Sequence, residues 1–139
     1  MPANTSPIFI INGNIAVARI SAANTTSDGS GSLVTVLTSG ANGSRVDGVR
    51  FRNSQVSLAA SSAMVHRIFL SDTAGANFRL IGEVATAAAT RSASVVGATS
   101  IFTFDQPVIM KPGQVMSVCQ SVYAGVQDQF DVTAYAGDY

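Results

Sequence analysis

Few residues in this chain have side chains of the kind that carry out catalysis. It contains one histidine, His66, and one cysteine, Cys119. A Ser-His-Asp triad would have to use His66, but no GxSxG motif accompanies it, so we interpret His66 as a strand residue that faces solvent or a neighbouring subunit. Cys119 follows Val118, which favours a buried thiol that behaves as a small hydrophobic residue. One histidine and one cysteine do not suffice for a zinc site, so the sequence predicts no catalytic residue and no metal.

The carboxylates are scattered along the chain rather than paired. Glu83 is the only glutamate, and glycoside hydrolysis needs two carboxyl groups opposed across a groove, which nothing in the spacing favours. Loop Thr25–Ser32 lacks the lysine and the glycine spacing of a phosphate-binding loop, so no cofactor is predicted. A structural calcium at Asp28 or Asp128 is an alternative. The following aspartates lie mostly in loops or at strand ends, where aspartate caps turns: Asp47, Asp72, Asp105, Asp128 and Asp131.

Arginine supplies nearly all of the positive charge, because Lys111 is the only lysine. Arg50 and Arg52 are two residues apart, so they share the polar face of one expected strand. They are either interface residues that seek carboxylates on a partner or solvated edge charges that discourage aggregation between sheets. Both interpretations remain open, and we take Arg50 and Arg52 as candidate interface residues.

The expected strand that carries these arginines belongs to the stretch Leu33–Arg52. Its first part, Leu33–Thr38, is almost entirely β-branched or leucine, and its last part alternates apolar and charged residues. Between them, Ser39–Ser44 contains glycine and asparagine, which tolerate a positive φ. The pattern predicts a β-hairpin, and a hairpin needs further strands to cover its apolar face.

The remainder of the chain supplies such strands. Met1–Ser6 is polar and is expected to form a flexible arm, followed by a single domain over Pro7–Tyr139. An NGN cluster after Ile11 predicts a turn, and Pro107 predicts an edge strand or a bulge. Eight or nine strands at this spacing are typical of an all-β, antiparallel β-sandwich, and a jelly roll fits that number. The expected strands are Ile8–Ile11, Ile15–Ala22, Met64–Ser71, Phe78–Ala85, Ser100–Met110, Val115–Tyr123 and Gln129–Tyr135.

Composition narrows the classes of partner. The 139 residues carry a formal net charge of zero and only 12% are charged, which argues against nucleic acid. Hydrophobic residues make up 47% and the mean hydropathy is +0.32, yet no run approaches the roughly 18 to 20 apolar residues that span a bilayer. We interpret the apolar excess as surface hidden in an assembly; the alternative is a bias toward alanine and glycine. The amino terminus lacks the features of a secretory signal.

Three stretches also carry a family resemblance: NTTSDGSGSLVTVLTSGANGSRVDGVRFR, FLSDTAGANFRLIGEV and the terminal AYAGDY. They resemble small structural proteins of tailed bacteriophages, of the capsid decoration (cement) type. The resemblance implies a non-enzymatic virion protein, made in the host cytoplasm, that binds the major capsid protein on the outside of the head shell as a homotrimer. Pro7, Ile8 and Phe9 join the two arginines as candidate interface residues.

A second functional hypothesis is a tail-fibre or baseplate module that binds host glycan. Such a module stacks sugars on surface aromatic side chains. The chain has no tryptophan and only three tyrosines, Tyr123, Tyr135 and Tyr139, so the sequence favours the decoration protein.

Overall fold

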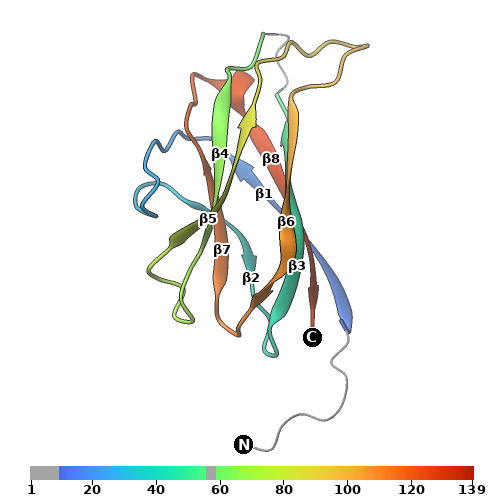
Figure 1. The fold of residues 1–139 in the computed structure, drawn as a ribbon. Coiled ribbons are helices and arrows are strands. Elements are labelled where there is room, and N and C mark those ends of the chain that lie inside the picture. Colours follow the sequence, from blue (N-terminus) through green and yellow to red (C-terminus); the bar gives the residue numbers. More distant parts are fainter. Residues whose placement is uncertain (1–9, 56–58) are drawn as a thin grey trace, which may run out of the picture.

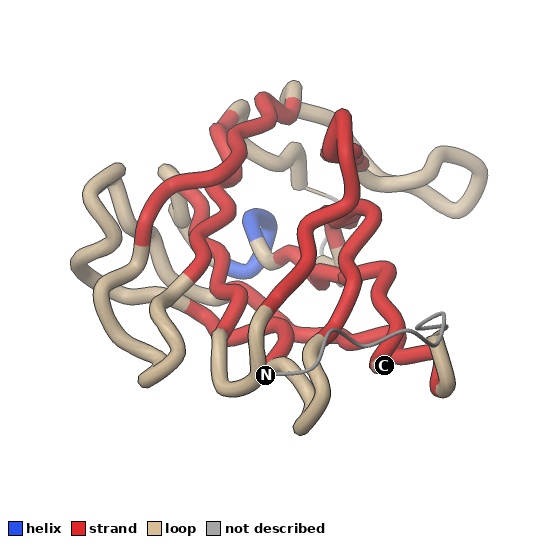
Figure 2. Tube along the Cα trace, turned by 60° about the horizontal axis from the view of Figure 1, so that its bottom comes forward, coloured by secondary structure: helices blue, strands red, loops and turns tan. Residues whose placement is uncertain are grey.

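The structure, a computed structural model, describes residues 10–55 and 59–139. The described chain is all-β, with two four-stranded antiparallel sheets packed face to face (Figures 1 and 2). This confirms the predicted fold class at the level of an antiparallel sandwich. The expected arm Met1–Ser6 and the start of the domain at Pro7 lie outside the described residues. The elements are β1 (Asn12–Ile20), β2 (Val34–Thr38), β3 (Ser44–Asn53), β4 (Met64–Leu70), β5 (Arg79–Thr86), β6 (Thr99–Met110), β7 (Val115–Gln120), the 3₁₀ helix η1 (Val126–Asp128) and β8 (Phe130–Asp138).

The strand order follows a regular rule. Sheet A has the order β1-β8-β3-β6, and sheet B has the order β2-β7-β4-β5. The pairs β1–β8, β2–β7, β3–β6 and β4–β5 are all antiparallel. The first half of the chain therefore pairs with the second half in reverse order, and only the β4–β5 connection joins neighbours within one sheet.

The predicted hairpin over Leu33–Arg52 is wrong. Both strands exist, but β2 belongs to sheet B and β3 to sheet A, so the turn between them carries the chain across the sandwich. The composition of a turn predicts that the chain reverses direction, but not whether the two flanking strands pair with each other. Here β2 pairs with β7, and β3 pairs with β6 and β8. A local pattern contains no information about those partners.

The predicted turn at the NGN cluster is also wrong, because these residues begin β1. Gly13 pairs with Gly137, and the side-chain amide of Asn14 donates to Asp138 Oδ2 at 3.1 Å. Two other local predictions are confirmed. Pro107 lies in the edge strand β6, next to an irregularity in its pairing with β3. Residues 111–114 form a turn in which Gly113 has φ of 81°, as a type II turn requires.

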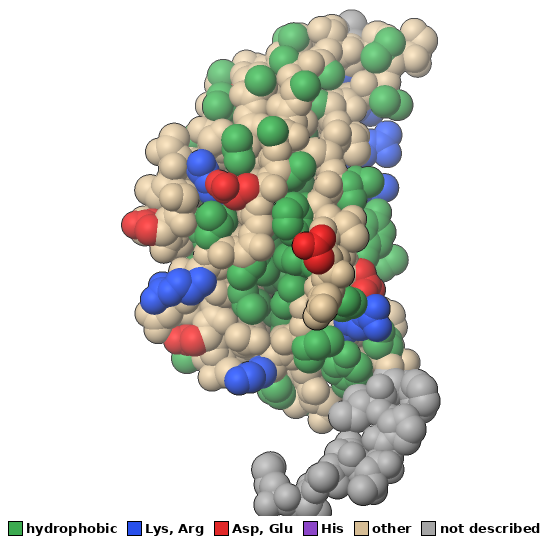
Figure 3. All heavy atoms as spheres, viewed as in Figure 1, with side chains coloured by type: hydrophobic (Ala, Val, Ile, Leu, Met, Phe, Trp, Pro, Cys, Tyr) green, Lys and Arg blue, Asp and Glu red, His purple; other side chains and the backbone are tan. Residues whose placement is uncertain are grey.

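The core lies between the sheets and is built by the alternation of each strand. In β3, Val49 and Phe51 are fully buried, whereas Arg50 and Arg52 point outward, as predicted. Hydrophobic side chains reach the surface between β5 and β6, where the sheets meet along one edge and the ring of Phe102 packs against Gly82 (Figure 3). The largest apolar side chains of the core are those of Phe51, Phe130, Ile20, Ile68, Met110 and Met116.

Gly43 gives a test of the turn that crosses between the sheets. It has φ of 98°, and a Cβ atom there would lie 2.7 Å from the carbonyl oxygen of Met110. We expect Gly43→Ala to lower the free energy of unfolding by about 1–3 kcal/mol, because it combines backbone strain with a clash. Urea denaturation measures the change. Gly13→Ala is the control, since nothing lies within 4 Å of its Cβ position, and equal losses for both variants would contradict the prediction.

Candidate interaction surface

The outer face of sheet A exposes apolar side chains that the core does not use. On β1 the small residues Ala16 and Ala18 point inward, and the larger Ile15 and Val17 point outward with 67% and 66% exposure. A strand with one solvent-exposed face ordinarily directs its larger apolar side chains into the core and polar side chains into solvent. β1 thus places its larger aliphatic side chains in solvent.

The same face continues across the other three strands. On β6, Ile101 and Ile109 are 59% and 58% exposed, while Phe102 and Phe104 point inward. The register aligns Val17, Thr133, Arg50 and Ile101 in one row across the sheet. In the neighbouring row, Tyr135 lies beneath the guanidinium of Arg50, whose carbon is 5.8 Å from the ring centroid. We define the outer face of sheet A as Ile15, Val17, Arg19, Arg50, Arg52, Thr99, Ile101, Thr103, Asp105, Ile109, Asp131, Thr133 and Tyr135.

The outer face of sheet B is different, because the loop between β1 and β2 packs on it. Asn24 N donates to Gln120 O at 2.8 Å, and the guanidinium of Arg67 donates to Thr25 O at 3.3 Å. Beneath this cover Phe69 and Cys119 are fully buried, which confirms the prediction for the cysteine. Burial also raises the pKa of the Cys119 thiol. Of the two outer faces, that of sheet A is therefore the one on which no loop of residues 10–55 or 59–139 packs in this way.

A pocket of about 320 Å³ lies at one end of the outer face of sheet A. It forms where β1 and β3 end and β8 begins, beside the loop between β5 and β6. We call it the arginine pocket, because three guanidinium groups share it with one carboxylate. An adjoining pocket of about 250 Å³ uses two of the same arginines and residues 92–96 of the loop. The arginine pocket is lined by Arg19, Arg52, Asn53, Ser54, Arg91 and Asp131.

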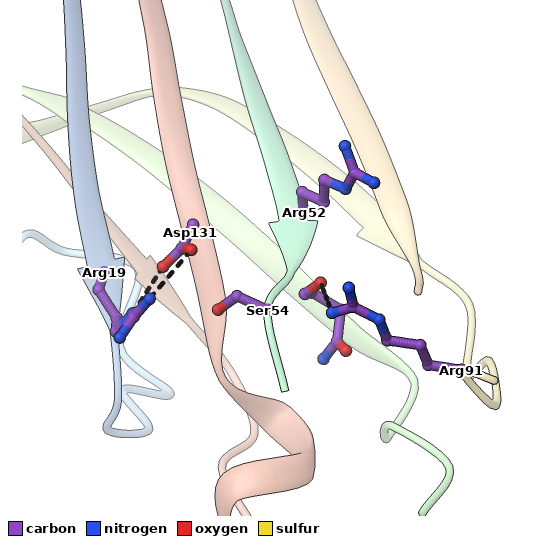
Figure 4. Close-up of a pocket in the computed structure, with 6 residues that line it drawn as sticks. Arg19, Arg52, Ser54, Arg91 and Asp131 are labelled. Atoms are coloured by element: carbon purple, nitrogen blue, oxygen red, sulfur yellow. Dashed lines mark hydrogen bonds and ion pairs between the residues drawn. The ribbon is translucent and has the colours of Figure 1, made fainter. Parts of the chain in front are cut away.

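The three arginines of this pocket are held differently (Figure 4). Arg19 forms two hydrogen bonds with Asp131, at 2.6 and 3.2 Å, and these lower the pKa of the Asp131 carboxyl. Arg91 donates to backbone oxygens, at 3.2 Å to Gln55. Arg52 has no hydrogen bond or ion pair within the described ranges. Arg52 and Arg91 lie on the far side of β3 from the Arg19–Asp131 pair, and this arrangement suits a bidentate anion such as a carboxylate.

The structure brings some of the predicted interface residues together. Arg50 and Arg52 both point outward from β3 onto the outer face of sheet A. Pro7, Ile8 and Phe9 lie outside the described residues. Sequence reasoning did not associate Arg19 and Arg91 with the arginine pocket. Arg19 already shared a side of its strand with Ile15 and Val17, but only the register places it in the row of Arg52.

The interpretation of His66 as a solvent-facing or subunit-facing residue is wrong. His66 is fully buried between the sheets, stacked on Phe51 with ring centroids 4.3 Å apart and edge-on to Phe130 at 4.6 Å. Neither ring nitrogen has a hydrogen-bond partner among the described residues. Burial lowers the pKa of His66 to about 3, so the ring is neutral at pH 7. The sequence signal was present, because His66 alternates in phase with Ile68, whereas Arg67 lies on the opposite side.

The two aspartates considered as calcium ligands bind donors of the chain itself. The buried Asp128 carboxylate accepts hydrogen bonds from Ser62 N at 2.6 Å, Ser62 Oγ at 2.9 Å and Ala124 N at 2.8 Å. Asp28 accepts from the backbone and hydroxyl of Ser30, which lowers the pKa of its carboxyl. Within residues 10–55 and 59–139, no three His, Cys, Asp or Glu side chains gather as metal ligands.

The described part of the chain also has no helix of the length and apolarity needed to cross a bilayer. The outer face of sheet A and its arginine pocket are the strongest candidate site, because they bring exposed apolar side chains and three arginines together on one surface. Comparison of the chain with protein-family models, with curated proteins and with solved structures gave no significant match.

Proposed function

We propose that this protein is a non-enzymatic virion structural protein: a jelly-roll capsid decoration protein that binds the phage head shell as a homotrimer. The jelly-roll assignment is supported by the strand order. A jelly roll has eight strands in two sheets, wound so that one long antiparallel ribbon folds over on itself. The pairs β1–β8, β2–β7, β3–β6 and β4–β5, divided between two sheets, support this assignment, because they join the first half of the chain to the second half in reverse order.

The observation that carries the functional proposal is the outer face of sheet A, which no loop of the described residues covers. Exposed apolar residues scattered singly are ordinary. Here four of the ten large exposed apolar side chains of the described residues share this one face, and Tyr135 and Arg50 lie on it as well. Aromatic residues and arginine are enriched at protein interfaces, where lysine is depleted. Such a face fits contact with neighbouring copies and with the major capsid protein.

The mechanism of such a protein is linkage between binding and shell stability. A protein that binds the assembled shell, and not its dissociated subunits, stabilises the shell by mass action. This function needs no catalytic group. It does need a rigid surface, and antiparallel strands packed on a common core supply one.

Val17 gives the test of the surface. Light scattering after gel filtration, over a dilution series, should give a trimer of three times the 14.3 kDa chain mass. We expect Val17→Asp to raise the dissociation constant of this trimer by about tenfold or more, because it buries an unpaired carboxylate in an apolar contact. Val126→Asp is the matched control, since Val126 is 52% exposed on η1 and belongs to no strand of sheet A.

Two outcomes would count against the proposal. The proposal would be contradicted if the wild-type chain stayed monomeric both at high concentration and on expanded phage heads. An equal rise in the dissociation constant of the trimer for Val17→Asp and Val126→Asp would show that the oligomer uses another surface. The alternative of a glycan-binding tail-fibre or baseplate module has less support, because Tyr135 alone of the three tyrosines lies on the outer face of sheet A.

A further inference from the structure

One carboxylate differs from all the others in its surroundings. The chain has eight aspartate and glutamate residues, all within the described ranges. Seven of them accept a hydrogen bond or form an ion pair with a neighbouring group. Asp105 is the exception: it is exposed and has no such partner in the described structure.

Asp105 lies on a protruding part of the sheet edge. β6 is an edge strand, and its pairing with β3 is irregular: Val46 pairs with Val108, but Gly48 pairs with Thr103. Four residues of β6 therefore stand opposite Asp47 alone. Three of the four, residues 105–107, are exposed. We call residues 104–107 the β6 bulge; bulges of this kind redirect side chains away from the regular pleat.

The arginine pocket holds arginines that lack a carboxylate partner, whereas Asp105 is a carboxylate that lacks an arginine. Arg52 is exposed and without a carboxylate, and Arg91 beside it is held only by backbone oxygens. The one carboxylate of the pocket, Asp131, already binds Arg19. A further carboxylate between Arg52 and Arg91 would form charge-assisted, bidentate hydrogen bonds.

Asp105 cannot reach the pocket of its own chain. Arg52 pairs across the sheet with Thr99, and the regular part of β6 from Thr99 to Thr103 alone spans roughly 13 Å at about 3.3 Å per residue, with Asp105 beyond it in the β6 bulge. No arginine side chain bridges that separation. Asp105 and Arg52 can therefore meet only between two copies of the chain. Arg50, which also has no carboxylate partner in the described structure, lies over the ring of Tyr135.

We infer that, in the assembled protein, the β6 bulge of one copy enters the arginine pocket of the next, with the Asp105 carboxylate between Arg52 and Arg91. This inference rests on the proposed function, because it names the contact through which the copies associate. The contact joins two different sites, so each copy offers one bulge and one pocket. Repeated about a threefold axis, such a head-to-tail contact closes into a ring and leaves neither site vacant.

A charge exchange tests this pairing. Arg52→Asp and Asp105→Arg should each raise the dissociation constant by about tenfold or more, since each places like charges in contact. The double variant again pairs opposite charges, with the acid now at position 52 and the arginine at position 105, and should recover most of the affinity between copies. Arg79→Asp is the control: Arg79 is an exposed arginine on β5 of sheet B, and its replacement should leave assembly unchanged. Light scattering over a dilution series measures all four variants.

The outcomes separate this inference from the function on which it rests. A wild-type oligomer that both single variants leave intact would overturn the Asp105–Arg52 pairing and leave self-association standing. A double variant whose loss of association free energy equals the sum of the two single losses would also overturn the pairing. Losses at independent sites add, whereas losses at two residues in contact do not. A wild-type chain that never associates would instead remove the proposed self-assembly itself.

Discussion

Asp128→Ala is expected to lower the free energy of unfolding by about 3 kcal/mol or more, the largest loss from a single side chain that we expect here. The Asp128 carboxylate is fully buried and accepts three hydrogen bonds, from Ser62 N, Ser62 Oγ and Ala124 N. Each buried donor left without a partner costs about 1–3 kcal/mol. The substitution also disconnects the segment before β4 from the segment after β7.

The measurement is urea denaturation of the wild type beside three variants, Asp128→Ala, Asp128→Asn and Asp47→Ala. Asp47→Ala is the control, because Asp47 pairs with Arg45 on the surface, where an ion pair contributes about 0–1 kcal/mol. Asp128→Asn retains one acceptor oxygen but turns an amide toward donors, so we expect a loss close to that of alanine. A loss for Asp128→Ala no larger than that for Asp47→Ala would contradict the structural role of the buried carboxylate.

The second large effect is a loss of stability in mild acid caused by His66. Its pKa is about 3 in the folded protein, against 6.5 for an exposed histidine. As the pH falls below 6.5 the unfolded chain takes up a proton that the folded protein does not. The free energy of unfolding should therefore fall by about 1.4 kcal/mol per pH unit, or about 2 kcal/mol between pH 6.5 and pH 5. The loss continues until the pH approaches the folded pKa.

His66→Leu isolates this effect. The chain has no other histidine, and hydrogen bonds lower the pKa values of the Asp28, Asp72 and Asp131 carboxyls, which moves their titration further below this pH range. Leucine has a similar volume and no titrating group, so the unfolding free energy of the variant should be nearly flat between pH 6.5 and pH 5. A slope equal to that of the wild type would assign the acid sensitivity to another group.

The sequence allowed correct prediction of what depends on neighbouring residues. Alternation in β3 separated the inward Val49 and Phe51 from the outward Arg50 and Arg52, because strand geometry gives successive side chains opposite directions. The placement of Pro107 at an edge followed from its missing N–H. These inferences need no knowledge of distant partners.

What could not be predicted depends on pairing between distant segments. The supposed hairpin divided between two sheets because β7 and β8, far along the chain, provide the partners of β2 and β3. The same reason hid the arginine pocket: Arg19, Asp131 and Arg52 become neighbours only through the registers of β1, β8 and β3. The interpretation of His66 was wrong for another reason. It gave more weight to the polar side chain of His66 than to its position on the same side of β4 as Ile68.

The reverse-order pairing of the strands determines when the outer face of sheet A comes into existence. β8 lies between β1 and β3, and it leaves the ribosome after every other described strand. Until then β1 has no neighbour in its sheet, so Ile15, Val17 and the arginine pocket cannot be presented as one surface. Folding must close large loops before these contacts form, which makes it slow. A nascent chain therefore lacks this surface, and the proposed association is deferred until synthesis has passed β8.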